Sequence, residues 1–404
     1  MMERGNKNIV VIGGGYGGIT AILRLARLFR SSPGFQLHLV DKNPFHTLKT
    51  RLHEAAVHKR EVTIDIGRII GKHNITFHLG TISAIDPALR TLRIGDQLLP
   101  YEYLILALGS QANFYNIPGL QQFAFPLQTL DDAERIYKHI SGLCARASSE
   151  KDESARRTML RFVIGGGGLS GIEFAAELAD RLRISARNYR LDRDEIEVHV
   201  VEAAAEILPT LNDVDRERLQ RKLNEKGIVV HTNTRIMNAS ENSVSMSPGE
   251  TLPTSTIVWT GGIRIANLIE KASLTKDSLG RIKVDEYLRS TDVPNLFAIG
   301  DNAFIINPRT GKPVPAAAQF ALQQGRLVAG NVHALATNGV LRPYRPRVLG
   351  EVISLGRHLA VGWFALPLVK KVTFIGFLGR LLKTAIHEKH VILLTKASRN
   401  WTFY

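Results

Sequence analysis

The chain has 404 residues, enough for about two or three domains that each bury a core. Hydrophobic residues make up 44% and charged residues 22%, which is ordinary for a globular protein and excludes a chain dominated by disorder. Cys144 is the single cysteine, which excludes a disulfide scaffold, a two-thiol redox centre and a cysteine-rich zinc or iron–sulfur site. Any redox chemistry therefore needs a cofactor, and we expect no metal site.

The net charge is +15, from 52 Lys and Arg against 37 Asp and Glu, which fits nucleic acid, anionic lipid or a soluble basic surface. Residues 342–404 alone carry eleven Lys and Arg against two acids, Glu351 and Glu388. Because the excess is concentrated at the C-terminus, we expect an anionic membrane surface as a partner and no nucleic acid.

The N-terminal apolar run, residues 9–12, is too short for the hydrophobic core of a signal peptide. No stretch of about 20 residues lacks charge, so the sequence predicts no membrane-spanning helix. We therefore expect a protein of the cytoplasm.

The chain opens with a strand, a glycine turn, a helix and a second strand, in NIVVIGGGYGGITAILRLARLF and FQLHLVDKN. Gly13, Gly15 and Gly18 form G-x-G-x-x-G, the spacing that brings a pyrophosphate onto a helix N-terminus. Asp41 ends the second strand, where a carboxylate accepts hydrogen bonds from ribose hydroxyls. The alternative, a glycine turn without a ligand, does not explain the acid.

A second copy follows about 150 residues later, in LRFVIGGGGLSGIEFAAELADRL and IEVHVVEAA. Its glycines are Gly166, Gly168 and Gly171, and Glu202 ends its second strand. A carboxylate here favours the free 2′-hydroxyl of NAD over the 2′-phosphate of NADP, and no arginine follows in AAAEIL to compensate. The alternative for Glu202 is an ordinary solvated acid.

Two dinucleotide sites in one chain indicate that NADH meets a flavin. Each unit is followed by an apolar strand that ends in glycine, YEYLILALGS at Gly109 and IVWTGGI at Gly261 and Gly262, and a third such strand, VPNLFAIGDNA, contains Gly300 and Asp301. We assign this third strand to a return of the chain to the first domain. The predicted division is 1–115 and 271–345 for the FAD domain, 116–270 for the NADH domain, and 346–404 for a C-terminal membrane-association region.

The motifs GGGYGG, GGGGLSGIE, VWTGGI, FAIGD and AAAQFALQQG together resemble those of the type II (alternative, non-proton-pumping) NADH:quinone oxidoreductases. These belong to the two-dinucleotide-binding-domain flavoproteins, and the resemblance covers nearly the whole chain. It implies an α/β fold with two Rossmann-like domains, for FAD and NADH, and a C-terminal amphipathic helix docked on the membrane. It also implies hydride transfer from NADH to FAD and two-electron reduction of a membrane quinone.

The resemblance also implies roles for individual residues. Glu173 matches the active-site glutamate, although a helix-dipole partner in the first turn of its helix is the alternative. Gln319 is expected at the quinone headgroup and, with Ala318, near the flavin. Lys383 is included among the cofactor-binding residues without an assigned role. The FAD phosphates, ribose, adenine and ribityl chain are assigned to Gly13, Gly14, Gly15, Tyr16, Gly17, Gly18, Asp41, Lys42, Ile82, Gly109 and Asp301, and the nicotinamide nucleotide to Gly166, Gly168, Gly171, Glu202, Gly261 and Gly262. His46 and His53 are expected close to the flavin as structural histidines.

The C-terminal segment is predicted to form one amphipathic helix that lies in an anionic membrane interface. The predicted apolar stripe is Leu368, Val372, Ile375, Leu382 and Ile386, widened by Phe374, Phe377 and Leu381. The predicted cationic side is Lys370, Lys371, Arg380 and Lys383, and the aromatic ending Trp401, Phe403 and Tyr404 suits the headgroup level. The alternative is a helix packed on its own domain.

Other functions remain open at this stage. Sulfide:quinone reductases and disulfide reductases on this scaffold need paired cysteines, which Cys144 cannot supply. A soluble NADH-dependent reductase of a protein electron carrier, and a slow NADH-sensing module, are the two alternatives. We expect a peripheral enzyme on the cytoplasmic face of the membrane with ubiquinone or menaquinone as acceptor, and a homodimer is possible.

Overall fold

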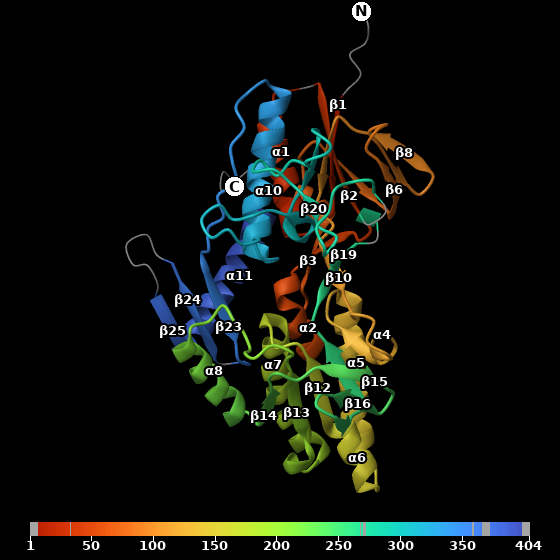
Figure 1. The fold of residues 1–404 in the computed structure, drawn as a ribbon, viewed down its shortest axis with the longest axis vertical. Coiled ribbons are helices and arrows are strands. Elements are labelled where there is room, and N and C mark those ends of the chain that lie inside the picture. The colour runs from red at the N-terminus through yellow and green to blue at the C-terminus, as the bar shows by residue number, and fades with distance from the viewer. Residues whose placement is uncertain are drawn as a thin grey trace, which may run out of the picture.

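The computed structural model describes residues 7–32, 34–266, 268–269, 272–357, 359–365 and 372–397. Two five-stranded parallel sheets dominate it, one in the upper and one in the lower half of Figure 1. The predicted α/β fold with two Rossmann-like units is confirmed.

The first sheet has the strand order β21-β9-β1-β2-β5, with every pair parallel. Its central strand β1 is buried from Ile9 to Ile12, as a strand covered on both faces requires. Helix α1 packs against β1 and lies side by side with α10, and a Cβ on Gly325 of α10 would clash with the carbonyl oxygen of Gly17 on α1. The bounds are Lys7–Ile12 (β1), Tyr16–Leu28 (α1), Phe35–Asp41 (β2), Ile75–Leu79 (β5), Tyr103–Leu106 (β9), Leu296–Ala298 (β21) and Ala318–Ala336 (α10).

The second sheet repeats this plan with the order β11-β18-β12-β13-β14, again parallel throughout. Its β12 and α7 correspond to β1 and α1 of the first unit. The bounds are Ala124–Pro126 (β11), Leu130–Ala147 (α5), Glu153–Leu160 (α6), Arg161–Gly165 (β12), Leu169–Tyr189 (α7), Glu197–Val201 (β13), Asp213–Glu225 (α8), Ile228–His231 (β14) and Thr256–Trp259 (β18).

The chain crosses between the two sheets twice, through β10 (Ser110–Ala112) and β19 (Ile263–Ile265), which pair antiparallel. After the second crossing β21 pairs with β9 of the first sheet. Gly300 and Asp301, which follow β21 in the 3-10 helix Gly300–Asn302, therefore lie close to Gly109, which follows β9.

Smaller elements decorate both units. They are Phe45–Thr47 (β3), Lys49–Arg51 (η1), Leu52–His58 (α2), Thr63–Asp65 (β4), Ile66–Ile70 (α3), Ile82–Asp86 (β6), Thr91–Ile94 (β7), Gln97–Pro100 (β8), Leu120–Phe123 (α4), Arg193–Glu195 (η2), Ile236–Ala239 (β15), Ser243–Met246 (β16), Glu250–Pro253 (β17), Ile282–Lys283 (β20), Gly300–Asn302 (η3) and Ala303–Phe304 (β22).

The C-terminal region is an antiparallel sheet followed by a helix, and the prediction of a helix running from Leu368 is wrong. Residues Val372–Gly376 form β25, which pairs with β24 (Ala360–Phe364) beside β23 (Gly350–Ser354), and the helix α11 covers Phe377–Ala397. The β-branched and aromatic residues of VTFIG suit a strand with a partner available, and tertiary pairing overrides their helical spacing. Leu368, Lys370, Lys371, Trp401, Phe403 and Tyr404 lie outside the described residues.

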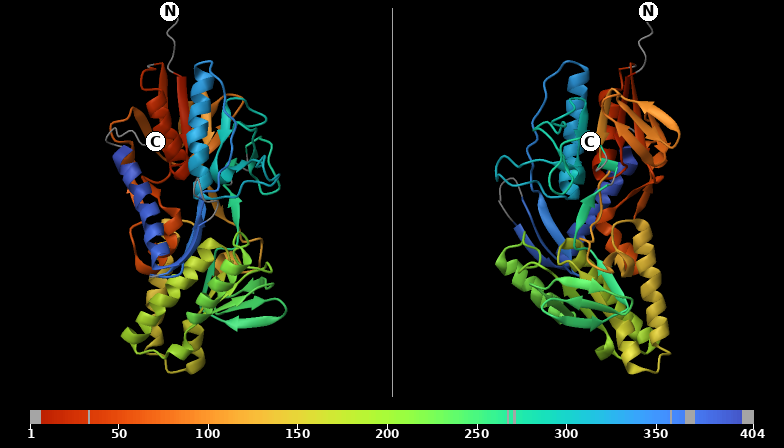
Figure 2. Two further views of the ribbon diagram at one scale, coloured as in Figure 1. Left: turned by 90° about the vertical axis from the view of Figure 1, so that its left-hand side faces the viewer. Right: turned by 45° about the vertical axis from the view of Figure 1, so that its right-hand side comes forward.

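This C-terminal unit touches both halves of the molecule. Helix α11 contacts α3 on the side of the first sheet, whereas β23 contacts α7 and β24 contacts α8 on the side of the second (Figure 2). Within the described residues, no helix has the length and apolar character needed to cross a bilayer.

Candidate active site

The turn between β1 and α1 forms a dinucleotide cradle. Gly13 has a φ of 104°, and a Cβ on Gly18 would clash with the carbonyl oxygen of Gly13, so both positions need glycine. A Cβ on Gly15 would meet nothing within 4 Å, which leaves this side open. Helix α1 starts without a side-chain cap and without an acid in its first turn. Its first N–H groups are therefore free to bind a phosphate.

Asp41 is fixed beside this turn by the backbone. Its Oδ2 accepts a hydrogen bond from the N–H of Gly14 at 2.5 Å and its Oδ1 accepts one from Asn43 at 2.8 Å. Each carboxylate oxygen has a second lone pair, so Asp41 can still accept ribose hydroxyls. Lys42, at the next position, is exposed, and Ile82 at the start of β6 is buried.

The far end of this cradle is built from segments about 190 residues apart. The hydroxyl of Ser110 donates to Oδ2 of Asp301 at 2.6 Å, and Nδ2 of Asn302 donates to the carbonyl oxygen of Gly109 at 2.7 Å. The N–H of Gly300 donates to Oε1 of Gln324 on α10 at 2.6 Å. These bonds hold Gly109, Asp301 and the start of α10 next to one another.

The turn between β12 and α7 repeats the first cradle. Gly166 has a φ of 110°, a Cβ on Gly171 would clash with the carbonyl oxygen of Gly166, and a Cβ on Gly168 would meet nothing within 4 Å. Helix α7 also begins without a side-chain cap or an acid in its first turn. Glu202 takes the place of Asp41, because it accepts hydrogen bonds from Gly167 at 2.6 Å and Ala204 at 2.8 Å.

Gly261 and Gly262 have a packing role in this structure. A Cβ on Gly261 would lie 2.7 Å from the Trp259 ring, and one on Gly262 would clash with the ring of Tyr115. The indole N–H of Trp259 donates to the carbonyl oxygen of Asn113 at 2.7 Å. Both glycines therefore allow the chain to pass close to two aromatic rings beside the second cradle.

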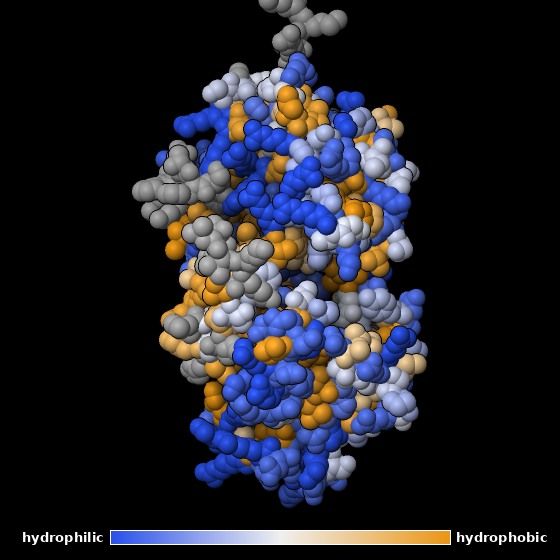
Figure 3. Space-filling model, turned by 60° about the vertical axis from the view of Figure 1, so that its left-hand side comes forward, coloured by the Kyte–Doolittle hydropathy of each residue, from blue (hydrophilic) through white to orange (hydrophobic). Residues whose placement is uncertain are grey.

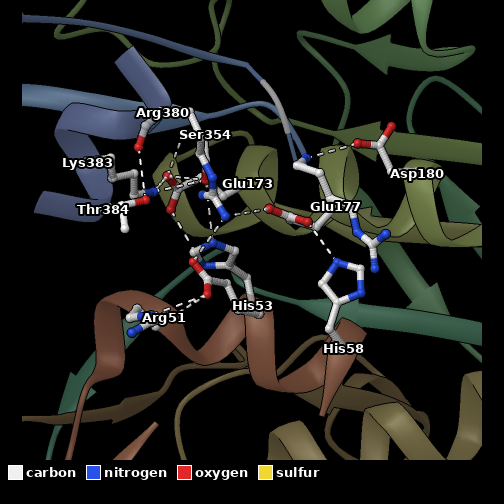
Figure 4. Close-up of polar contacts among 12 residues, drawn as sticks. Arg51, His53, His58, Glu173, Glu177, Asp180, Ser354, Arg380, Lys383 and Thr384 are labelled. Carbon is white, nitrogen blue, oxygen red and sulfur yellow. Dashed lines mark hydrogen bonds and ion pairs between the residues drawn. The ribbon is translucent and has the colours of Figure 1, made fainter. Parts of the chain in front are cut away.

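Glu173 stands at the junction of the two sheets and the C-terminal unit (Figure 4). Its Oε1 accepts hydrogen bonds from the N–H of Ser354 at 2.8 Å, the hydroxyl of Ser354 at 3.0 Å and Nζ of Lys383. Its Oε2 lies 3.6 Å from Nδ1 of His53 on α2. Glu173 is the fifth residue of α7, and no acid lies in the first turn, so the helix-dipole alternative is wrong. Its partners come from elements far apart in the sequence.

The pKa values in this cluster depend on burial and on the neighbouring charges. Burial by itself would raise the pKa of Glu173, but Lys383, His53 and the hydrogen bonds from Lys383 and Ser354 lower it below its usual value. Burial lowers the pKa of His53, and the negative charge of Glu173 only partly opposes this effect. Near neutral pH the site therefore holds a carboxylate ion-paired with Lys383 beside a neutral imidazole.

The placement of Lys383 and Arg380 corrects the sequence analysis, which put both on the solvated cationic side of a membrane helix. The Lys383 side chain is 6% exposed and pairs with Glu173. The guanidinium of Arg380 lies 3.6 Å from Glu54 and 3.8 Å from Glu177. Charge patterning alone cannot distinguish a solvated cation from one that meets a buried carboxylate about 200 residues away.

The inward face of α11 continues with His387 and His390. Burial lowers the pKa of His387 to about 4 and that of His390 to about 3. The His390 ring lies 5.0 Å from the ring of Tyr16 and 5.7 Å from that of His46. His46 donates from Nδ1 to the carbonyl oxygen of Gly14 at 2.8 Å, so it supports the first cradle.

The side-chain amide of Gln319, a residue expected at the quinone headgroup, forms hydrogen bonds with the backbone. Its Oε1 accepts from the N–H of Leu349 at 3.0 Å and its Nε2 donates to the carbonyl oxygen of Gly350 at 3.3 Å. Gln323, one turn later, makes the same two-point contact with Arg347. One N–H of Gln319 remains for a ligand. The backbone groups that pair with these two side-chain amides could not be predicted from the sequence.

Lys49 is a further residue that the sequence analysis missed. Its exposed side chain brings Nζ within 3.8 Å of the position that a Cβ on Gly109 would occupy. It begins the short helix η1 (Lys49–Arg51) and belongs to no motif, so only the fold brings it to the first cradle.

Comparison with known proteins agrees with this geometry. The model of the pyridine nucleotide-disulphide oxidoreductase family matches residues 7–325. The chain belongs to this family. The family match ends before β23, so it does not include Ser354 or Lys383.

The similarity to individual relatives also includes the C-terminal unit. A type II NADH:quinone oxidoreductase of Staphylococcus aureus is 28% identical over 92% of the chain and 94% of its own length. Residues 1–325 are only 325 of 404, so a match over 92% has to extend beyond them. 

Solved structures share the fold. NDH2 from Plasmodium falciparum, in a complex with NADH, superposes with a TM-score of 0.85 at 18% identity and covers 97% of this chain and 96% of its own. The sulfide:quinone oxidoreductase of Aquifex aeolicus gives a TM-score of 0.79 at 19% identity, with coverage of 97% and 92%.

Proposed function

We propose that the protein is an FAD-dependent NADH:quinone oxidoreductase of type II. The observation that carries the proposal is the buried cluster of Glu173, Lys383 and Ser354, where a carboxylate and an ammonium meet between two dinucleotide cradles and an outer sheet. Such a cluster can hold and protonate the oxygen of a quinone headgroup. The similarity to the Staphylococcus aureus oxidoreductase over 92% of the chain supports the same reading.

FAD fits the first cradle. The glycine turn is open at Gly15, Asp41 is positioned for ribose, and Asp301 with the start of α10 would hold the ribityl chain and the ring system. When bound, FAD supplies the two-electron redox chemistry that this chain, with one buried cysteine, cannot supply itself.

The second cradle suits NADH. The carboxylate of Glu202 would accept ribose hydroxyls and repel a 2′-phosphate, and Ala203, Ala204 and Ala205 beside it offer no cation. We therefore infer a preference for NADH over NADPH.

The chain's own residues would work mainly by positioning. The ammonium of Lys383 and the remaining N–H of Gln319 would donate hydrogen bonds to quinone oxygens. Glu173 would hold the Lys383 side chain in place, and His53 would sit behind Glu173 as a neutral proton acceptor.

Membrane attachment is proposed through the outer face of α11. Arg380, Lys383, His387 and His390 face the protein, whereas Phe377, Leu381, Leu382 and Ile392 are 61%, 50%, 38% and 45% exposed. Several exposed apolar side chains on one helix, beside exposed charges such as Lys389, are typical of an interfacial helix. Figure 3 brings this side forward and shows hydrophobic side chains gathered along its left edge. We propose a peripheral protein on the cytoplasmic face of the membrane.

Steady-state NADH oxidation by the FAD-loaded protein tests the proposal. Turnover should need a quinone, should exceed that with a ferredoxin-type protein carrier, and should require NADH. Comparable rates with the protein carrier would favour the soluble reductase, and slow oxidation with every acceptor would favour the sensing module.

A further inference from the structure

A second carboxylate and a second histidine lie one helical turn from Glu173. Glu177 follows Glu173 by four residues on α7, so both project from the same face of the helix. Its Oε2 accepts a hydrogen bond from Nε2 of His58, the last residue of α2, at 2.8 Å. In Figure 4 Glu177 lies between His58 and the cluster around Glu173.

We propose that His58 and Glu177 deliver the proton that quinone reduction takes from water, by a path that continues through His53 to Glu173. This inference rests on the proposed function and deepens it. NADH, one proton and a quinone become NAD⁺ and a quinol. NADH brings two electrons and one proton, so one proton has to enter the buried site from solvent in every turnover.

The exposure of the side chains sets the direction of the path. The side chain of His58 is 14% exposed, that of Glu177 is 1% exposed, and those of His53 and Glu173 are 3% and 8% exposed. His58 is therefore the point where water can add a proton to Nδ1 of the imidazole, while the proton on Nε2 passes to Oε2 of Glu177. The charge of Glu177 also acts on His53, where it opposes the lowering of the His53 pKa by burial. The proposed link from Glu177 to His53 is a single bridging water. Nδ1 of His53 lies 3.6 Å from Glu173.

A purely structural ion pair does not explain Glu177 well. Its Oε1 is fully buried and has no hydrogen-bond partner among the described residues, and its nearest cation, Arg380 Nη2, is 3.8 Å away. A buried acceptor without a partner costs about 1–3 kcal/mol and usually has a functional reason. Other charges near this region include Glu54 on α2 with its partners Arg51 and Arg60, and Arg181 on α7, which donates to the carbonyl oxygen of Val57. Glu54 lies 3.6 Å from Arg380, so it shares that cation with Glu177.

The test is stopped-flow spectroscopy on the FAD-loaded full chain, which separates the half-reactions. The variants are His58→Gln and Glu177→Gln, with Arg60→Gln as a matched control because Arg60 contacts the same ion cluster two residues after His58. Flavin reduction by NADH should be unchanged in all three. Reoxidation by a short-chain ubiquinone should slow about 10- to 100-fold in the two path variants and stay normal in the control.

Two further readouts separate proton delivery from structural damage. Reoxidation by ferricyanide, which accepts electrons without protons, should be normal in every variant. Added imidazole should restore the quinone rate in His58→Gly. If His58→Gln and Glu177→Gln keep the parent rate with ubiquinone, or lose the ferricyanide rate equally, the path is wrong. If the parent itself does not transfer electrons to ubiquinone, the proposed function fails instead.

Discussion

Replacement of Lys383 by methionine tests the ion pair at the centre of the site. Met has nearly the volume of Lys but no charge, so Lys383→Met leaves the carboxylate of Glu173 buried without its cation. Both side chains are less than one tenth exposed, at 6% and 8%. Breaking a buried pair in this way costs about 3–5 kcal/mol. With an unfolding entropy of about 2.1 cal/mol/K per residue over 404 residues, this corresponds to a fall in Tm of roughly 4–6 °C.

The pH dependence of this loss follows from the pKa of Glu173. In the parent the folded-state pKa lies below the unfolded value, so Glu173 stabilises the fold above pH 4.5 and this contribution is lost as the pH falls further. Without Lys383, burial pushes the pKa of Glu173 upward, and the fold is penalised whenever the unfolded carboxyl would ionise. The difference between parent and Lys383→Met should therefore be small near pH 4 and grow toward pH 7.

Thermal unfolding of the parent, Lys383→Met, Glu173→Gln and the double variant measures this coupling. The double variant should recover most of the lost Tm at pH 7, because this pair leaves no buried charge, and should lack the part of the pH dependence between 4 and 7 that Glu173 contributes. A coupling below about 0.5 kcal/mol, or a double variant as unstable as Lys383→Met, would refute the buried ion pair.

Four further outcomes are expected. Glu173→Gln should keep the flavin and the fold but slow turnover with quinone, and an unchanged rate with an intact flavin spectrum would remove Glu173 from the mechanism. Glu202→Gln should raise kcat/KM for NADPH relative to NADH, and equal use of both nucleotides by the parent would contradict the role of Glu202. The pair Phe377→Ser and Leu381→Ser should weaken binding to anionic liposomes by about 2–4 kcal/mol, roughly 30- to 1000-fold. Leu89→Ser with Leu98→Ser is the control, because these side chains are also well exposed, at 74% and 55%, in the β6–β8 hairpins, and equal loss in both pairs would contradict docking by α11. His46 has a folded-state pKa of about 4 against 6.5 unfolded, so stability should be complete above pH 6.5 and fall by up to about 3 kcal/mol as the pH drops to 4. His46→Gln, which keeps a donor for Gly14, should flatten that part of a Tm–pH profile, and an unchanged slope would show that His46 is not the titrating group.

The two dinucleotide cradles could be predicted from the sequence because their determinants are local. Gly13, Gly15 and Gly18 sit within six residues, and Asp41 follows at the end of the next strand, so spacing alone predicts the turn, the helix N-terminus and the acid. The same holds for the repeat around Gly166. The structure adds how the acids are held, by N–H groups of their own glycine turns.

The centre of the site could not be predicted in the same way. Glu173 and Lys383 are 210 residues apart, and the pattern around Lys383 fits a solvated cation equally well. The strand β25 could not be predicted because it has only five residues, too few to show a clear strand periodicity. Its pairing with β24, which ends eight residues earlier, decides its structure. Ser354 carries no motif at all. Long-range packing decides these positions, and local sequence cannot.

The most direct test of the central claim is an anaerobic single turnover. The FAD-loaded protein is first reduced with one equivalent of NADH, and a short-chain quinone is then added. We expect the flavin absorbance to bleach and then recover within the turnover time, with one quinol formed per NADH. A flavin that bleaches with NADH but stays reduced in the presence of quinone would contradict the proposed function.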